Sequence, residues 1–329
     1  MAQAYQLRQH NVQLKTTLTQ LTEEVVTGVQ TDIGRAVGGD FTALAAIDHS
    51  LNTLESYGRV ATEAQLFSGT MQGALDLVQT LATEIGPSLV SAATNSSPTL
   101  VATTTSDAVQ RFEAAISALN TNVAGRYVFS GNAVDTKPLA SADDILAALG
   151  AAISTETTAP GIVSAVEAWF SAPTGSGGFS DLAYAGSASA LGAMRITEGE
   201  AIELNVTAQD ATIRDTLMGF ALAALVSADM VPSGSDARSG LTQAAGERLI
   251  TADSNLTVLR AKIGATEGRI ADAQVENRNQ SASLKLARQS LIEADPYDTA
   301  TALEAIKTQI ETLYKLTSRL SALSLADYL

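Results

Sequence analysis

The sequence predicts a mainly α-helical protein. The N- and C-terminal parts are expected to form a long antiparallel helical bundle or coiled coil, with a central mixed α/β insert at its tip. Three observations support this fold class. Aliphatic residues recur at helical spacing near both ends, and a strict seven-residue repeat runs through the last third. Only the middle has short segments punctuated by Gly and Pro.

The N-terminal segment, residues 1–36, is expected to form one helix of an inner coiled coil. Its apolar residues are spaced so that they share one helix face. This stripe consists of Leu7, Leu14, Leu18, Leu21 and Val25. Asn11 belongs to the same repeat, and a polar residue in such a seam often fixes the register of the helices.

Residues 37–137 are interpreted as the first half of a helical rod. A long helix is expected from about Asp40 to about Ile85, where Gly86-Pro87 is able to break or kink it. A further helix is expected around Phe112, which shares a face with apolar neighbours three and four residues away.

The rod is expected to end in a strand at 125–131, where the chain turns into the insert. Tyr127 and Phe129 alternate with Arg126 and Val128, which predicts that one pair packs inward while the other faces out. The residues assigned to this corner are Gly125, Tyr127, Phe129 and Gly131.

The outer insert is placed at 138–210. It contains several Gly- and Pro-rich breaks, a hairpin pattern at 194–207, and the pair Trp169-Phe170, which is interpreted as the centre of a small core. The second half of the rod is expected at 211–294. Its seven-residue series consists of Leu256, Ile263, Ile270, Asn277, Leu284 and Leu291.

The last segment, 295–329, is expected to be the second helix of the inner coiled coil. Asp295 is a good N-cap, and Pro296 suits the first helical position. Its apolar stripe consists of Leu303, Ile306, Ile310, Leu313, Leu320 and Leu323. The two terminal stripes most simply pair with each other. Because an isolated two-helix arm is marginally stable, both arms are predicted to fray in the free subunit and to order against neighbouring subunits.

Composition argues against several function classes. The net charge is −15, and residues 61–249 carry 19 acidic against 7 basic side chains, so no basic face for nucleic acid is expected. The chain has no cysteine and two distant histidines, and no catalytic, metal or cofactor residues are assigned. An enzyme is therefore not expected. Neither a membrane-spanning run nor a cleaved signal peptide is expected.

Four stretches resemble the flagellin family, specifically the flagellar hook-associated proteins of the hook–filament junction type. They are the N-terminal helix followed by Gly38-Gly39-Asp40, the stretch GRYVFSGNAVDTKPL at 125–139, the stretch EADPYDTATALEAI at 293–306, and the end LSALSLADYL. The resemblance covers roughly 1–140 and 210–329. An Arg-Leu-Ser-Ser-Gly run, usual in filament subunits, is absent from this sequence.

The resemblance implies a structural subunit that joins hook-associated proteins to the filament as a ring of copies in a helical tube. It also implies flagellin and a neighbouring hook-associated protein as partners, an export chaperone, and an extracellular location reached through the flagellar type III apparatus. Two alternatives remain: a flagellin or flagellin-like filament subunit, and a soluble coiled-coil signalling protein.

Overall fold

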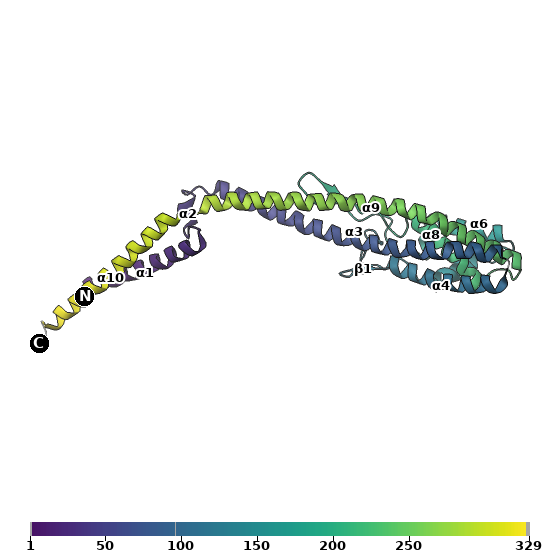
Figure 1. Cartoon of the computed structure of the whole chain (residues 1–329), viewed down its shortest axis with the longest axis horizontal. Coiled ribbons are helices and arrows are strands. Elements are labelled where there is room, and N and C mark those ends of the chain that lie inside the picture. Colours follow the sequence, from purple (N-terminus) through teal and green to yellow (C-terminus); the bar gives the residue numbers. More distant parts are fainter. Residues whose placement is uncertain (1, 96, 327–329) are drawn as a thin grey trace. The chain divides into compact units, whose positions relative to one another are not determined.

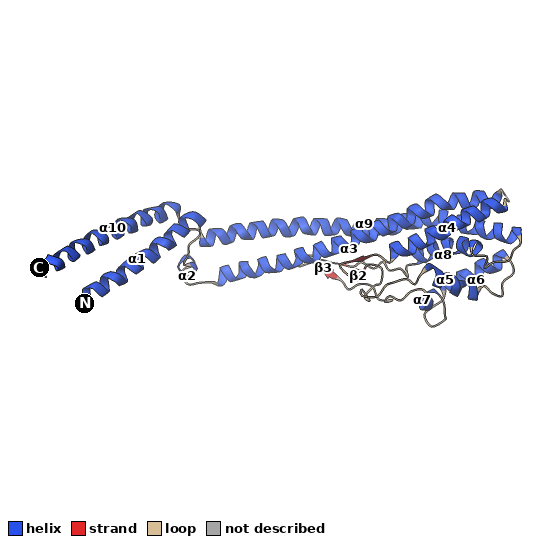
Figure 2. Ribbon diagram, turned by 90° about the horizontal axis from the view of Figure 1, so that it is seen from below, coloured by secondary structure: helices blue, strands red, loops and turns tan. Residues whose placement is uncertain are grey.

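The structure is a computed structural model, which describes residues 2–95 and 97–326; side chains are described for 5–95 and 97–319. It is mainly helical, with two short two-stranded sheets in the described chain, as Figure 2 shows. The chain divides into two compact units. The first comprises Met1–Ser56 with Asn277–Leu329, and the second comprises Tyr57–Glu276.

The first unit is built around two terminal helices, α1 (Ala2–Thr27) and α10 (Pro296–Ala326), which pack against each other. They are antiparallel, so the start of α1 and the end of α10 lie at the same end of the pair (Figure 2). The unit also holds the short helix α2 (Ile33–Ala36) and one end each of α3 (Thr42–Thr94) and α9 (Ser235–Ile292).

The second unit is a helical bundle with one large core and a smaller, separate apolar cluster that includes Ile202 and Ile270. It contains the remaining parts of α3 and α9, together with α4 (Pro98–Leu119) and α8 (Ala211–Ser227), as labelled in Figure 1. Helix α8 is buried on almost every side: twelve of its seventeen residues are buried. A helix that is apolar all round has to lie inside a core, and α4 and α9 accordingly carry long buried faces toward it.

The seven-residue series of α9 is buried in the expected way. Leu256, Ile263 and Ile270 are 0–3% exposed, and Asn277 is 5% exposed. The polar member of the series therefore lies in the seam, as the sequence predicts, and the end of the series, Leu284 and Leu291, is half-buried.

The helix expected to end near Ile85 is not broken at Gly86-Pro87, because α3 continues as one helix to Thr94. Proline costs the helix one backbone hydrogen bond and crowds the preceding turn. Here the residues on both sides of it, Ile85 and Leu89, are 3% and 0% exposed. Core packing on either side of Pro87 therefore outweighs the local preference for a break.

Helices α3 and α9 approach closely where two glycines face each other. A Cβ atom added to Gly246 would lie 2.7 Å from the carbonyl oxygen of Gly86 and 2.7 Å from Cγ2 of Val90. Gly246 therefore has no room for a larger residue without movement of a backbone, and Gly86 is tightly packed, with its nearest contact to an added Cβ at 3.1 Å. The local sequence thus sets the distance between these two helices.

The strand expected at 125–131 is shorter than predicted. β1 (Asn122–Val123) pairs antiparallel with β2 (Arg126–Tyr127), and the chain then leaves the ladder. Val128 and Phe129 are both buried, at 3% and 0% exposure, while Arg126 and Tyr127 are half-buried. The predicted alternation of faces is therefore wrong, because the strand ends before the period of two can repeat.

The insert packs directly on the bundle. Its helices are α5 (Ala142–Ala152), α6 (Ala159–Ser171) and the short α7 (Phe179–Leu182), and α5 and α6 contact α8. Trp169, Phe170 and Phe179 form an aromatic cluster, with the first two rings edge to face at 5.1 Å. The core position expected for Trp169-Phe170 is confirmed, and it is continuous with the bundle core.

The hairpin expected at 194–207 is present in a short form, in which β3 (Met194–Arg195) pairs with β4 (Ala201–Ile202). The five segments expected from the sequence, with limits at 36, 137, 210 and 294, stay a prediction. Among the described residues, no helix combines the length and the apolar character that crossing a bilayer requires.

Candidate assembly surface of the terminal helices

Helix α10 begins as its sequence predicts. The Asp295 side chain accepts hydrogen bonds from the backbone N–H groups of Tyr297 at 2.8 Å and Asp298 at 3.1 Å, and Pro296 occupies the first helical position. Capping the free amides of the first turn fixes the point where the helix starts. The same start point determines which residues of α10 form the apolar stripe that faces α1.

The two stripes meet, but the pair buries them only in part. Leu14 and Leu313 are the buried members, at 6% and 8% exposure. The half-buried members are Leu7, Leu18, Leu21, Leu303, Ile306 and Ile310. Val25 is 45% exposed, and the side chains of Leu320 and Leu323 lie outside the described residues. Two helices can cover only one side of such a stripe, so apolar surface remains available.

A polar group between the helices sets their register. The Tyr314 hydroxyl is hydrogen-bonded to Lys15 and to Asn11, and these contacts hold the pKa of Tyr314 below its ordinary value. Asn11 was recognised in the sequence as a seam residue, whereas Tyr314 was not. Its partners lie on a helix some three hundred positions away, and local periodicity carries no sign of such a contact.

The base of the helix pair is closed by backbone contacts. Val29 forms an antiparallel bridge with Glu293, and the N–H of Gln30 donates to the carbonyl of Ile292 at 2.8 Å. The N–H of Thr31 donates to Oε1 of Glu24, also at 2.8 Å. These bonds tie the end of α1 to the start of α10, so the two helices leave one corner together.

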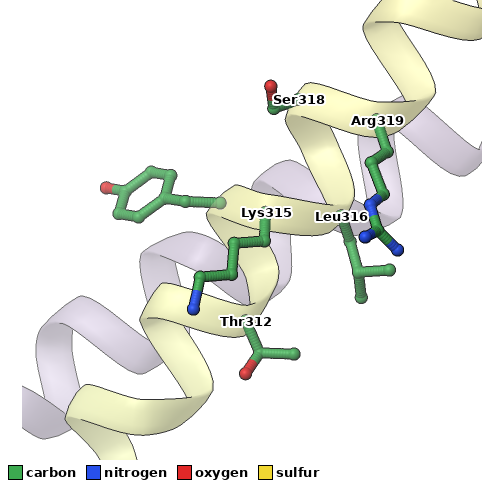
Figure 3. Close-up of a pocket in the computed structure, with 6 residues that line it drawn as sticks. Thr312, Lys315, Leu316, Ser318 and Arg319 are labelled. Carbon is green, nitrogen blue, oxygen red and sulfur yellow. The ribbon is translucent and has the colours of Figure 1, made fainter.

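The outward faces of the pair carry large apolar side chains. Tyr5 and Val12 on α1 are 61% and 65% exposed, Val26 is 80% exposed, and Leu316 on α10 is 50% exposed. A shallow groove on α10 runs beside Leu316 and is bordered by Lys315 and Arg319, which Figure 3 shows projecting from the helix. A matching groove on α1 includes Arg8 and Val12. Such exposed aliphatic and aromatic residues are typical of an interaction surface.

The corner residues serve packing at the junction of the bundle and the insert. Gly125 and Gly131 have φ of +81° and +60°, and a Cβ on Gly131 would lie 2.4 Å from the carbonyl oxygen of Ser189. The carbonyl of Phe129 accepts a hydrogen bond from the N–H of Ala208 at 2.9 Å, which ties the two ends of the insert together. Within the described residues, no group of acidic and histidine side chains is arranged to hold a metal ion.

Residues 248–329 match the family model for the bacterial flagellin C-terminal helical region. Two solved structures share the fold. One is a protein assigned as a flagellar hook-associated protein of Vibrio parahaemolyticus, with a TM-score of 0.52 and 12% identity over 74% of this chain and 94% of that one. The other is FlgL of Bacillus cereus, with a TM-score of 0.53 and 13% identity over 74% of this chain and 100% of that one.

A comparison with curated protein sequences finds no significant match. The family match covers the last part of α9 and all of α10, and α10 is one of the two helices of the terminal pair. The chain therefore carries a flagellin-family C-terminal region and has the fold of flagellar hook-associated proteins.

Proposed function

We propose that this protein is a structural subunit of the bacterial flagellum, placed at the junction between hook-associated proteins and the filament. The observation that carries the proposal is the half-buried apolar stripe of α1 and α10 within a flagellin-type terminal region. An assembly subunit needs such a surface, because each copy then completes the seam of its neighbours.

The mechanism is coupled folding and assembly. In the free subunit the contact between the two terminal helices buries only two leucines of the stripes fully and the others in part. This small buried surface leaves the helix pair marginally stable. Neighbouring copies cover the remaining apolar surface and thereby order both helices. The interface consists of the stripe residues from Leu7 to Val25 and from Leu303 to Leu323. Assembly then requires no enzyme activity and no cofactor.

The partners follow from the position in the flagellum. Copies of this chain form a ring in the tube, with a hook-associated protein on one side and flagellin on the other. The subunit leaves the cell through the flagellar type III apparatus, and an export chaperone covers the C-terminal stripe before export. Each of these partners would contact the helices that a single copy leaves half-exposed.

A filament subunit is the second candidate, because the flagellin C-terminal match fits it equally well. The stretch Gly125 to Gly131 favours the junction type, and the shared fold with FlgL supports the same choice. The alternative role as a soluble coiled-coil signalling protein has no comparable support.

The test is to delete the gene in its native host and to locate the tagged protein on purified hook–filament assemblies by immunogold electron microscopy. A junction subunit gives a label confined to the hook–filament boundary, and its loss gives hooks without filaments and flagellin released to the medium. Normal filaments in the deletion strain would reject the junction role, and label along the whole filament would favour the second candidate.

A further inference from the structure

The smaller apolar cluster of the second unit is closed by a segment of the insert. Its buried residues, at 0–2% exposure, are Ala61 and Ala64 on α3, Ile270 and Ala273 on α9, and Ile196 and Ile202 in the hairpin formed by β3 and β4. Alanine side chains leave room between two packed helices, and the larger isoleucines of the hairpin occupy that room. The hairpin therefore covers the seam between α3 and α9 at this point.

The cluster lies beyond the end of the large core. Along the two long helices, the large core extends to Phe67 on α3 and to Ile263 on α9. The half-buried Met194 packs against both clusters. A group of buried residues that is largely separate from the main core is able to open on its own, at a lower free energy than the whole unit.

Residues 192–203, which we call the flap, have an anchored residue at each end. Leu191 packs against the large core, and Leu204 belongs to it, at 4% exposure. Within the flap, Ile196 and Ile202 are buried, and the other residues are half-buried or exposed. A segment that is held at its ends and by two side chains in its middle is able to lift while both ends stay in place.

The solvent side of the flap contacts Arg269 of α9. The guanidinium Nε lies 2.7 Å from Oε1 of Glu200, and Nη2 donates to the carbonyl of Ala201 at 3.3 Å. The side chains of Arg269 and Glu200 are 51% and 37% exposed, and an ion pair so open to water changes a local equilibrium by less than about fivefold. Full burial of an isoleucine contributes more than this. Apolar packing therefore decides whether the flap is closed.

The hairpin of β1 and β2 contacts α3 nearby, but it lacks this freedom. Arg126 of β2 forms an ion pair with Glu63 and lies over the ring of Phe67, 4.8 Å from its centroid. Val128 and Phe129 follow directly and belong to the large core. Lifting this hairpin would pull residues out of the large core, whereas lifting the flap leaves both of its anchors there.

We propose that the flap is a reversibly opening cover of the seam between α3 and α9. It lifts about Leu191 and Leu204 without unfolding of the helical bundle, and Ala64 and Ile270 become accessible while it is open. Because an isolated two-stranded hairpin is marginally stable in water, β3 and β4 separate once the flap has lifted. Helix α8 stays buried, since its residues belong to the large core. The proposal goes beyond the proposed function, because it concerns the insert and does not depend on the terminal helices.

Engineered cysteines measure the opening, because the natural chain has none. The test variant is Ala64→Cys, beneath the flap, and the matched control is Ala82→Cys, on the same helix in the large core; both alanines are 0% exposed. The reaction of each thiol with a maleimide is followed in the folded full-length protein, at urea concentrations below the unfolding transition. The rate at position 64 should depend little on urea, since lifting the flap exposes little surface. The thiol at position 82 should react through unfolding of the bundle, with a steep dependence on urea.

Two matched substitutions identify the motion that exposes the thiol. Ile202→Val removes a methylene group from the flap and Ile213→Val removes one from the large core, and both isoleucines are 0% exposed. In the Ala64→Cys background, Ile202→Val should accelerate labelling about two- to tenfold, whereas Ile213→Val should leave the rate unchanged. Arg269→Gln should accelerate labelling at position 64 by less than about fivefold. In the Ala82→Cys background, Ile213→Val should accelerate labelling.

The proposal is overturned if the thiols at positions 64 and 82 react at the same rate with the same urea dependence, or if Ile213→Val accelerates both, because the flap then opens only with the bundle. A thiol at position 64 that reacts as fast as an exposed one would also overturn it, since the seam would then not be covered.

Hydrogen exchange of the wild-type protein supplies a check without any substitution. The N–H groups of Ile196 and Thr197 donate to the carbonyl of Glu200 at 3.0 and 3.2 Å. Both should exchange at a rate nearly independent of urea. Protection of these amides equal to that of α8, with the same urea dependence, would show that the flap does not open separately.

Discussion

The close approach of α3 and α9 makes a sharp prediction for Gly246→Ala. An added Cβ would lie 2.7 Å from the carbonyl oxygen of Gly86 and 3.0 Å from the backbone nitrogen of Val90, both nearer than ordinary van der Waals contact. Backbone atoms cannot rotate away as a side chain does, so the helices must separate. Overpacking of this kind costs about 1–3 kcal/mol.

The matched control is Gly268→Ala, on the same helix, where an added Cβ meets nothing within 4 Å. Both substitutions gain roughly 1 kcal/mol of helix propensity. The free energy of unfolding of the Gly246 variant should therefore fall below that of the Gly268 variant by about 1–3 kcal/mol, and the Gly268 variant should exceed the wild type.

Urea unfolding followed by tryptophan fluorescence is the suitable assay. Trp169 is the single tryptophan of the chain, and it belongs to the same core as Leu249, one turn from Gly246. Its signal therefore reports the unit that contains the substitution. If Gly246→Ala proved as stable as Gly268→Ala, the helices would not meet at these glycines and the reasoning would be refuted.

Three further outcomes are expected from the same assay. Phe129→Ala should lower the free energy of unfolding by about 3–5 kcal/mol, because Phe129 is fully buried, while Leu66→Ala, at a 53% exposed position, should change it little. Ala124 has φ of +51°, a backbone conformation that is strained for alanine and accessible to glycine. Ala124→Gly should therefore raise the free energy of unfolding by up to about 1 kcal/mol, and a decrease would show that the backbone at this position is not strained. Hydrogen bonds from the N–H groups of two loop glycines hold the pKa of Asp181 below its ordinary value, so its stabilising effect is present above the unfolded pKa and disappears as pH falls through the folded one. Acid titration of Asp181→Ala should accordingly lack that part of the wild-type loss of stability, and identical profiles would show that the loop contributes nothing.

The long helices were predictable because their information is local. The start of α10 follows from Asp295 and Pro296 alone, and the heptad series of α9 predicts burial through Leu256 and Ile270, which is what the structure has. The whole heptad series lies within the single helix α9, Ser235–Ile292.

Features that depend on a partner element could not be predicted. Nothing near Pro87 indicates that core packing on either side would keep α3 intact, and nothing near Val128 indicates that the strand ends one residue earlier. Asn11 signalled a polar seam position, yet its contact with Tyr314 depends on which residue of α10 comes opposite. The same applies to the approach of Gly86 and Gly246, which only the crossing of two helices reveals.

The burial of α8 on all sides has a consequence for how the second unit opens. A helix with twelve buried residues and no substantial polar face has no acceptable solvated state. Any partial unfolding that exposed α8 would create an intermediate with a large apolar surface, and this intermediate would aggregate with other copies. The unit is thus expected to come apart in a single cooperative event, in which α3, α4, α9 and the insert release α8 together.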